Sequence, residues 1–109
     1  MTEVYKPLGQ AALAATTLTD VYTVPAGKSA VISTVFICNR SASPVAVRLS
    51  VAVAGTADDD KQYIAYEQSI PARETLSITA GITLAATDVL RAYAASADIS
   101  VNVFGSEIT

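Results

Sequence analysis

The 109-residue sequence predicts an all-β protein, a single antiparallel β-sandwich of about seven to eight strands. Three observations predict this class. Bulky apolar residues recur at every second position, as they do in strands with one buried face. Clusters of Gly, Pro, Asn, Asp and Ser separate these runs at the spacing of turns. Apolar residues make up 51% of the chain and charged residues only 16%, so a core can form.

The alternation is clearest in residues 45–53, where every odd position is Val or Leu and the even positions are mostly small and neutral. Residues 30–38 are apolar on both faces, which is typical of a central strand that is covered on both sides. Ala80-Gly81 predicts a bulge or bend, and Gly105 a bulge or a close backbone approach. The expected strands are residues 18–24, 29–39, 45–54, 62–69, 75–83, 89–95 and 99–108. A jelly-roll order and an immunoglobulin-like order both remain open.

The N-terminal stretch does not share this pattern. Its Ala-rich segment 11–15 is too short to nucleate a stable helix. We therefore expect residues 1–16 to form an extended arm or edge segment, followed by the sandwich domain 17–109. Tyr5, Leu8 and Leu13 are then expected to contact a neighbouring subunit.

The composition excludes several function classes. The chain has no His and a single Cys, Cys38, so it has no Ser-His or Cys-His pair, no His metal ligand and no internal disulfide. The net charge of −3 and the wide spacing of the basic residues argue against nucleic acid as a partner. We find no signal peptide and no apolar run long enough to cross a bilayer, so we expect no membrane partner.

The acidic residues suggest two candidate sites, each with a simpler explanation. The run 58–60, which is Asp-Asp-Asp, offers oxygen ligands for calcium but lacks the spacing of an EF-hand loop, and a solvated hairpin tip explains it equally well. Two of the remaining carboxylates could act as acid and base in a hydrolase, although we expect most of them at turns or facing solvent. These carboxylates are Glu67, Glu74, Asp88, Asp98 and Glu107. Asp88 is expected to cap a turn.

Cys38 and the tyrosines have structural explanations too. Cys38 follows two apolar residues and is expected to pack as a small apolar side chain. Tyr22, Tyr63, Tyr66 and Tyr93 could present a sugar-binding surface, or could be core residues and cross-strand pairs. We therefore predict no catalytic residue, no cofactor and no metal ligand.

The outward positions of the expected strands are unusually free of charge. In the segment 45–54 they are Ala46, Arg48, Ser50 and Ala52. Small neutral residues also occupy the outward positions 77, 79 and 100. Interface cores are depleted in charge in the same way, and uncovered edge strands without Lys invite aggregation. We infer that these residues contact other subunits and that the domain is one tile of a symmetric assembly.

Three stretches carry a resemblance to a known family. They are residues 17–41 (TLTDVYTVPAGKSAVISTVFICNRS), 81–95 (GITLAATDVLRAYAA) and 101–108 (VNVFGSEI). Together they resemble small virion structural proteins of tailed bacteriophages. The resemblance implies a non-catalytic β-sandwich that decorates heads or builds collars, tails or fibres. It also implies a homo-oligomer, expected to be a trimer, that contacts major capsid or tail proteins in a virion assembled in the host cytoplasm.

Two other functions remain open. A carbohydrate- or receptor-binding module of a tail fibre would require exposed Tyr63, Tyr66 or Tyr93 clustered beside Asp or Asn. A small hydrolase would require two of the carboxylates to face each other across a substrate.

Overall fold

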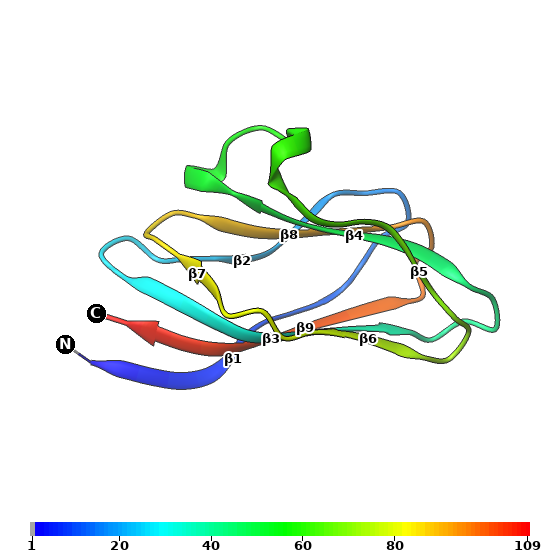
Figure 1. Cartoon of the computed structure of the whole chain (residues 1–109), viewed down its shortest axis with the longest axis horizontal. Helices are drawn as coiled ribbons and strands as arrows, with labels where there is room; N and C mark the ends of the chain where they lie inside the picture. Colours follow the sequence, from blue (N-terminus) through cyan, green and yellow to red (C-terminus); the bar gives the residue numbers. More distant parts are fainter. Residues whose placement is uncertain (1) are drawn as a thin grey trace.

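The computed structural model describes residues 2–109 and confirms the all-β class. These residues form nine strands in two antiparallel sheets that lie face to face (Figure 1). The strands are β1 Glu3–Ala12, β2 Thr19–Thr23, β3 Ser29–Asn39, β4 Val45–Ala52, β5 Tyr63–Ile70, β6 Thr75–Ile78, β7 Ile82–Leu84, β8 Val89–Ala94 and β9 Ile99–Ile108. Two single-turn 3-10 helices, η1 Val53–Gly55 and η2 Asp60–Gln62, lie between β4 and β5.

The strand order is that of a jelly roll. One sheet has the order β1-β9-β3-β6, with β7 also pairing with β3, and the other has the order β2-β8-β4-β5. With β6 and β7 taken as one interrupted strand, the chain is a long antiparallel hairpin that pairs β1 with β9, β2 with β8, β3 with β6 and β7, and β4 with β5. Alternate pairs of this hairpin lie in opposite sheets, which gives the eight-stranded jelly-roll arrangement.

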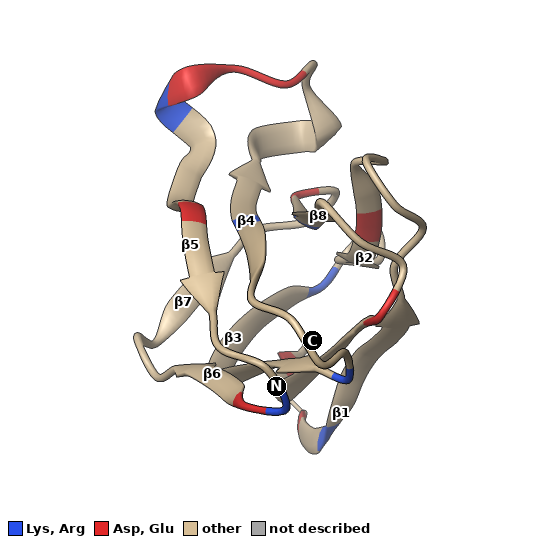
Figure 2. Ribbon diagram, turned by 90° about the vertical axis from the view of Figure 1, so that its right-hand side faces the viewer, with Lys and Arg blue, Asp and Glu red and all other residues tan. Residues whose placement is uncertain are grey.

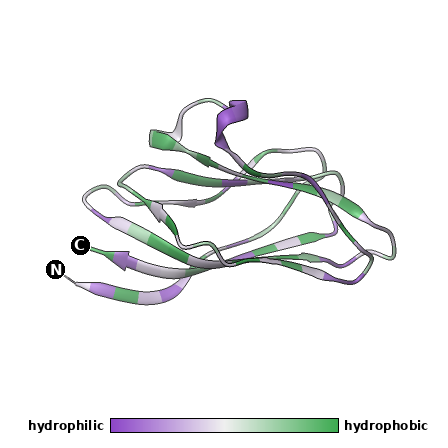
Figure 3. Ribbon diagram, viewed as in Figure 1, coloured by the Kyte–Doolittle hydropathy of each residue, from purple (hydrophilic) through white to green (hydrophobic). Residues whose placement is uncertain are grey.

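The core lies between the sheets and consists of the alternate apolar residues that the sequence singles out. Ile32 and Val35 of β3 and Val101 and Val103 of β9 are fully buried there, opposite Leu49 of β4. Figure 3 shows the hydropathy changing from residue to residue along the strands. Each such aliphatic side chain contributes about 1.5–3 kcal/mol on burial. Hydrophobic burial on the inner faces therefore holds the two sheets together.

Residues 3–12 form an edge strand of the five-stranded sheet. β1 pairs with β9 from Glu3 to Ala12, and Leu13 beyond it is only 2% exposed. Gly9 lies where β1 passes close to β2, and a Cβ atom there would be 2.5 Å from the carbonyl oxygen of Val21. The segment is extended, and it is tied to the rest of the sandwich by its pairing with β9, which is irregular between Pro7 and Gly9, and by the core side chain of Leu13.

Two strands end earlier than the sequence pattern suggests. The expected strand 75–83 is divided into β6 and β7 at Gly81, whose φ of +58° breaks the extended backbone where a bend was expected. β4 ends at Ala52 because Ala54 and Gly55 both have positive φ. The other expected strands agree with the structure to within one residue at each end.

The connection between β4 and β5 folds back over the outer face of the four-stranded sheet (Figure 1). Arg91 of β8 donates hydrogen bonds to the carbonyl oxygens of Thr56 (2.7 Å) and Gly55 (3.2 Å). Ser50 pairs with Arg91 in the ladder, and Ala52 pairs with Val89. The Val89 side chain lies against Gly55, where a Cβ atom would be 3.6 Å from it. Both Ser50 and Ala52 are therefore fully buried under the chain's own loop.

Candidate binding surfaces

The outer face of the five-stranded sheet carries no charged residue over most of its area. Residues that are directly paired in a sheet share a face, so the register defines four successive outward rows. We call these rows the neutral face: Tyr5, Ser106, Val31 and Thr83; Pro7, Phe104 and Thr34; Gln10, Asn102, Phe36 and Ser77; Ala12, Ser100, Cys38 and Thr75. Figure 2 shows β3, which crosses its middle, without a charged residue along its length.

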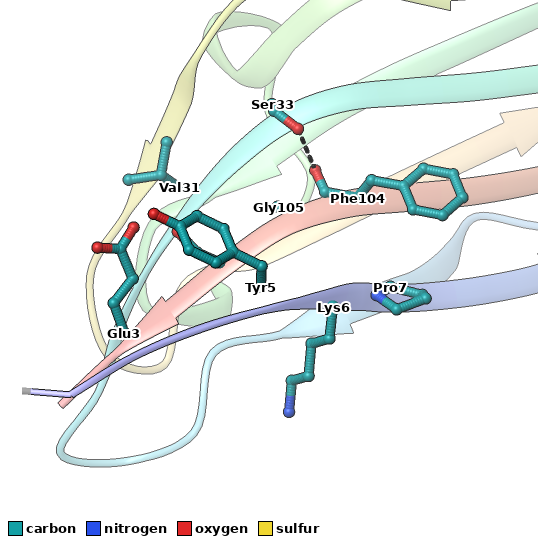
Figure 4. A pocket seen from close by; sticks show the side chains of 9 residues that line it. Glu3, Tyr5, Lys6, Pro7, Val31, Ser33, Phe104 and Gly105 are labelled. Carbon is teal, nitrogen blue, oxygen red and sulfur yellow. Dashed lines mark hydrogen bonds between the residues drawn. The ribbon is translucent and has the colours of Figure 1, made fainter.

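The neutral face has both protruding and concave apolar features. Tyr5 is 78% exposed, and Phe36 is 40% exposed and packs edge-to-face on Phe104 at a centroid distance of 5.9 Å. A groove of about 670 Å³ lies beside Tyr5 and is bordered by Val31 and Phe104 (Figure 4). The groove is held in shape by the Ser33 hydroxyl, which donates a 3.1 Å hydrogen bond to the Phe104 carbonyl.

The outer face of the four-stranded sheet has the opposite character, because it gathers aromatic and charged side chains. The Arg48 guanidinium lies between the rings of Tyr66 (4.5 Å to the centroid) and Tyr93 (4.3 Å). Tyr63 packs edge-to-face against Tyr66 at 5.0 Å. Glu67 accepts a 2.8 Å hydrogen bond from Nη2 of Arg48. We call these five residues the Arg48 cluster.

Electrostatics hold the Arg48 cluster together. The Glu67 carboxylate raises the pKa of Arg48 above its usual range, and the hydrogen bond from Arg48 lowers the pKa of Glu67. Partial burial, followed by the 2.9 Å hydrogen bond that its hydroxyl donates to Asp58, raises the pKa of Tyr63. The guanidinium is therefore neutralised by Glu67 and stacked between two rings, an arrangement that fixes the positions of the aromatic side chains.

Glu107 is buried at one end of the sandwich. It is 5% exposed, and its Oε1 lies 2.8 Å from Nζ of Lys6 and 3.7 Å from Nζ of Lys28. Tyr22 donates a 2.6 Å hydrogen bond to Oε2. Glu107 is therefore an exception among the five carboxylates, most of which were expected at turns or facing solvent. Its sequence position predicts burial, because Glu107 is in phase with the inward residues Val101 and Val103.

Asn39 is a second buried polar residue that sequence reasoning did not identify as important. It is fully buried at the end of β3, and its Nδ2 donates to the carbonyl oxygens of Ser43 (2.8 Å) and Ile70 (3.0 Å). Its Oδ1 accepts hydrogen bonds from the backbone N–H (2.9 Å) and hydroxyl (2.7 Å) of Ser41. One side chain thus joins the 40–44 loop to the end of β5.

Some of the residues expected at an interface are buried inside this chain, and others lie on its surface. Leu13, Ser50 and Ala52 are buried inside this chain, so they belong to no exposed surface. The outward direction of Ser50 and Ala52 agrees with the sequence pattern, but the β4–β5 connection covers them. Tyr5 lies on the neutral face, and Arg48 is at the centre of the Arg48 cluster. Leu8 and Ala46 are half-buried, and their role in an interface stays a prediction.

The remaining candidate residues have structural partners of their own. Asp88 caps the turn as expected, accepting from the backbone N–H of Ala85 (2.9 Å), and it also binds Ala54 N–H (2.8 Å). Glu67 binds Arg48 and Glu107 binds Lys6, so these two carboxylates do not share a site. Cys38 is half-buried on the neutral face rather than packed in the core. Tyr22 is a core residue, 7% exposed.

Asp58, Asp59 and Asp60 lie at the tip of the β4–β5 connection, which appears as the acidic stretch in Figure 2. Asp58 accepts a hydrogen bond from Tyr63, and Asp59 accepts one from the backbone N–H of Lys61 at 3.3 Å. Within residues 2–109, no group of three or more His, Cys, Asp and Glu side chains is arranged to hold a metal ion. No helix in the same range has the length and apolar character needed to span a membrane.

Comparison with known proteins gives a weak structural likeness. No protein-family model and no curated protein matches the chain. Two solved structures, both described as a pentameric capsid protein isolated from metagenomic phage sequences, are similar to it over 98% of its length at 19% identity. Their TM-scores are 0.34 and 0.35, and the chain covers 62% and 60% of their lengths. These scores are too low to carry an argument about function.

Proposed function

We propose that this chain is a non-catalytic structural subunit of a tailed-bacteriophage virion, a jelly-roll tile that associates with copies of itself and decorates or stabilises the capsid, collar or tail. The supporting observation is the neutral face. The outer side of β3 carries the apolar residues Val31 and Phe36 together with Ser33 and Thr34, and this chain buries only the inner side fully. Phe36 and Tyr5 therefore remain exposed, and a partner that covers them would complete the burial.

A second copy of the chain fits the neutral face. The four rows of the neutral face contain no charged group that contact would remove from water, and the charged Glu3 and Lys6 lie at the groove beside Tyr5. Tyr5 protrudes from the face, and the groove beside it is large enough to receive an aromatic ring. The sequence resemblance to small virion proteins suggests the particle in which these copies assemble. Major capsid or tail proteins would be the further partners, with assembly in the host cytoplasm.

Native mass spectrometry tests the association directly. The wild-type protein is expected to have the mass of two or more copies of the 11.3 kDa chain. Three copies are expected from sequence, whereas the two structural neighbours are described as pentameric. Phe36→Lys places a charge in the middle of the neutral face and should shift the mass to one copy. Ile64→Lys, at a 44% exposed position on β5, is the matched control and should retain the oligomer.

A monomer of 11.3 kDa at micromolar concentration, or an oligomer that Phe36→Lys leaves intact, would contradict the proposal. Images of particles assembled with and without the protein test the virion role, and density lost from the particle surface is expected in its absence. A deletion of residues 2–16 is a poor test of attachment, because it removes β1 and the core residue Leu13.

A second candidate function is the carbohydrate- or receptor-binding module of a tail fibre. One observation favours it. Tyr93, which is far from Tyr63 and Tyr66 in sequence, meets Tyr66 at the Arg48 guanidinium, and Tyr63 packs on Tyr66 and binds Asp58. Such a module was expected to need exposed tyrosines clustered beside Asp or Asn, and Tyr66 is the exposed member of this group.

A further inference from the structure

The exposed part of the Arg48 cluster has the geometry of a small ligand site. A hollow of about 330 Å³ is lined by Tyr63, Tyr66 and Asp60. Tyr66 is 59% exposed although Arg48 covers its ring on one side, so much of the remaining ring surface is open to solvent. Small-molecule sites in proteins combine apolar or aromatic surface with a few well-placed polar groups, and this hollow has both.

The aromatic side chains are held in place before any ligand binds. Tyr66 is fixed between the Arg48 guanidinium and the edge of Tyr63, and the Tyr63 hydroxyl is anchored on Asp58. Arg48 is itself held by Glu67 at 2.8 Å and by stacking on Tyr93. A ligand that stacks on Tyr66 therefore encounters a rigid ring and loses little additional conformational entropy of the protein.

The charges around the hollow select against anions. Asp60 lines it, Asp58 accepts a hydrogen bond from Tyr63, and the guanidinium of Arg48 is already paired with Glu67. Among residues 2–109, the Asp60 carboxylate forms no side-chain hydrogen bond or ion pair within the chain, so it is available as an acceptor. Carboxylate oxygens accept hydrogen bonds from hydroxyl groups, and tyrosine rings pack on apolar C–H surface. A ligand with hydroxyl donors, an apolar ring face and no negative charge meets all of these conditions.

We propose that the hollow formed by Tyr63, Tyr66 and Asp60 binds a neutral sugar ring, which stacks on Tyr66 and donates hydroxyl hydrogen bonds to Asp60. This inference rests on the second candidate function and is independent of the copy-to-copy association through the neutral face. The two surfaces lie on opposite sides of the sandwich, because each is the outer face of a different sheet. Sugar binding and self-association can therefore occur in the same molecule.

The test is a glycan array that contains neutral oligosaccharides of glucose, galactose, mannose and N-acetylglucosamine together with sialylated and sulfated glycans. Binding to neutral glycans only is expected. For the strongest neutral glycan, calorimetry with Tyr66→Ala should show an affinity at least about tenfold weaker, through lost stacking. Asp60→Asn should also weaken binding, because an ionised acceptor forms the stronger hydrogen bond. Val4→Ala, at a 47% exposed position of β1 outside the neutral face, is the control and should bind as the wild type does.

Silence of the folded wild-type protein on the neutral glycans overturns the proposal, and so does preferential binding of anionic glycans. Affinity that is the same in Tyr66→Ala, Asp60→Asn and wild type also overturns it. Circular dichroism of each sample shows whether the variant is folded, and its native mass shows whether it still self-associates, so a failed sugar site is distinguished from misfolding and from a failed oligomer. An intact oligomer without glycan binding rejects the sugar site alone, whereas glycan binding by a monomer rejects the structural tile alone.

Discussion

The Tyr22 hydroxyl donates a 2.6 Å hydrogen bond to Oε2 of Glu107 inside the sandwich, across 85 residues of sequence. Tyr22 belongs to β2 of the four-stranded sheet and Glu107 to β9 of the five-stranded sheet, so this bond joins the two sheets. Lys6 of β1 completes the group with its ion pair to the other carboxylate oxygen. Three strands are therefore connected through one buried carboxylate.

Tyr22→Phe is expected to lower the free energy of unfolding by about 1–3 kcal/mol, because a buried acceptor loses its donor. Glu107→Gln should also destabilise the protein, since it removes the charge that Lys6 binds. The two residues are in direct contact, so their effects should be non-additive in chemical denaturation of the double variant. Effects that sum to within the error of the measurement would show that the bond does not couple the sheets.

Glu107 also predicts how stability changes in acid. Its hydrogen bond from Lys6, followed by the one from Tyr22, lowers its pKa below the ordinary value of 4.5. The native carboxyl therefore binds fewer protons than the unfolded one, and the resulting stabilisation is present above pH 4.5 and lost as the pH falls through the native pKa. Urea denaturation at several pH values should show a smaller acid loss for Glu107→Gln than for wild type. An identical loss in both proteins would contradict this assignment.

Ser50→Ala is expected to leave stability unchanged or to raise it by up to about 1 kcal/mol. Ser50 is fully buried beneath the β4–β5 connection, and its hydroxyl oxygen has no hydrogen-bond partner within residues 2–109. Removing a buried polar group that is unsatisfied removes its desolvation cost. Thermal and chemical denaturation measure the change, and a loss greater than about 1 kcal/mol would indicate that the hydroxyl has a partner such as a water molecule.

Asn39→Ala is expected to cost about 2–4 kcal/mol, because it leaves the buried carbonyl oxygen of Ile70 and several groups of the 40–44 loop without their partner. Ser41→Ala, which removes one hydroxyl from the exposed side of the same loop, is the control and should cost less. Denaturant unfolding measures both variants. If they lower the free energy of unfolding equally, the stabilisation comes from the bonds within the 40–44 loop and not from the hydrogen bond between Asn39 and Ile70 of β5.

Gly9→Ala is expected to destabilise the fold by at least about 1–3 kcal/mol, because the new methyl group would be 2.5 Å from the carbonyl oxygen of Val21 and would force β1 and β2 apart. Gly81→Ala adds a methyl group into open space, and only its positive φ opposes the substitution. It should cost about 1 kcal/mol. Thermal denaturation compares the two. A larger loss for Gly81→Ala would show that β1 can shift without cost.

The fold could be predicted from sequence to the level of class and strand position, because these depend on local patterns. The alternation in β3 and β9 and the turn residues between strands placed most elements to within one residue. The sequence also identified the tyrosines that form the Arg48 cluster, but not their meeting around Arg48. Their contacts depend on the pairing of β4 with β5 and β8, which local periodicity does not specify.

The sequence by itself determined the β-sandwich class, the inward and outward side of most strand residues, and the neutral outward positions 77 and 100 of what became the neutral face. The tertiary structure decided the jelly-roll order, the burial of Leu13, Ser50 and Ala52, and the placing of Glu107 between Lys6 and Tyr22. The physical reason is the range of the interactions. Side-chain direction follows from the two-residue repeat of a strand, whereas burial depends on which distant segment of the chain packs against each face.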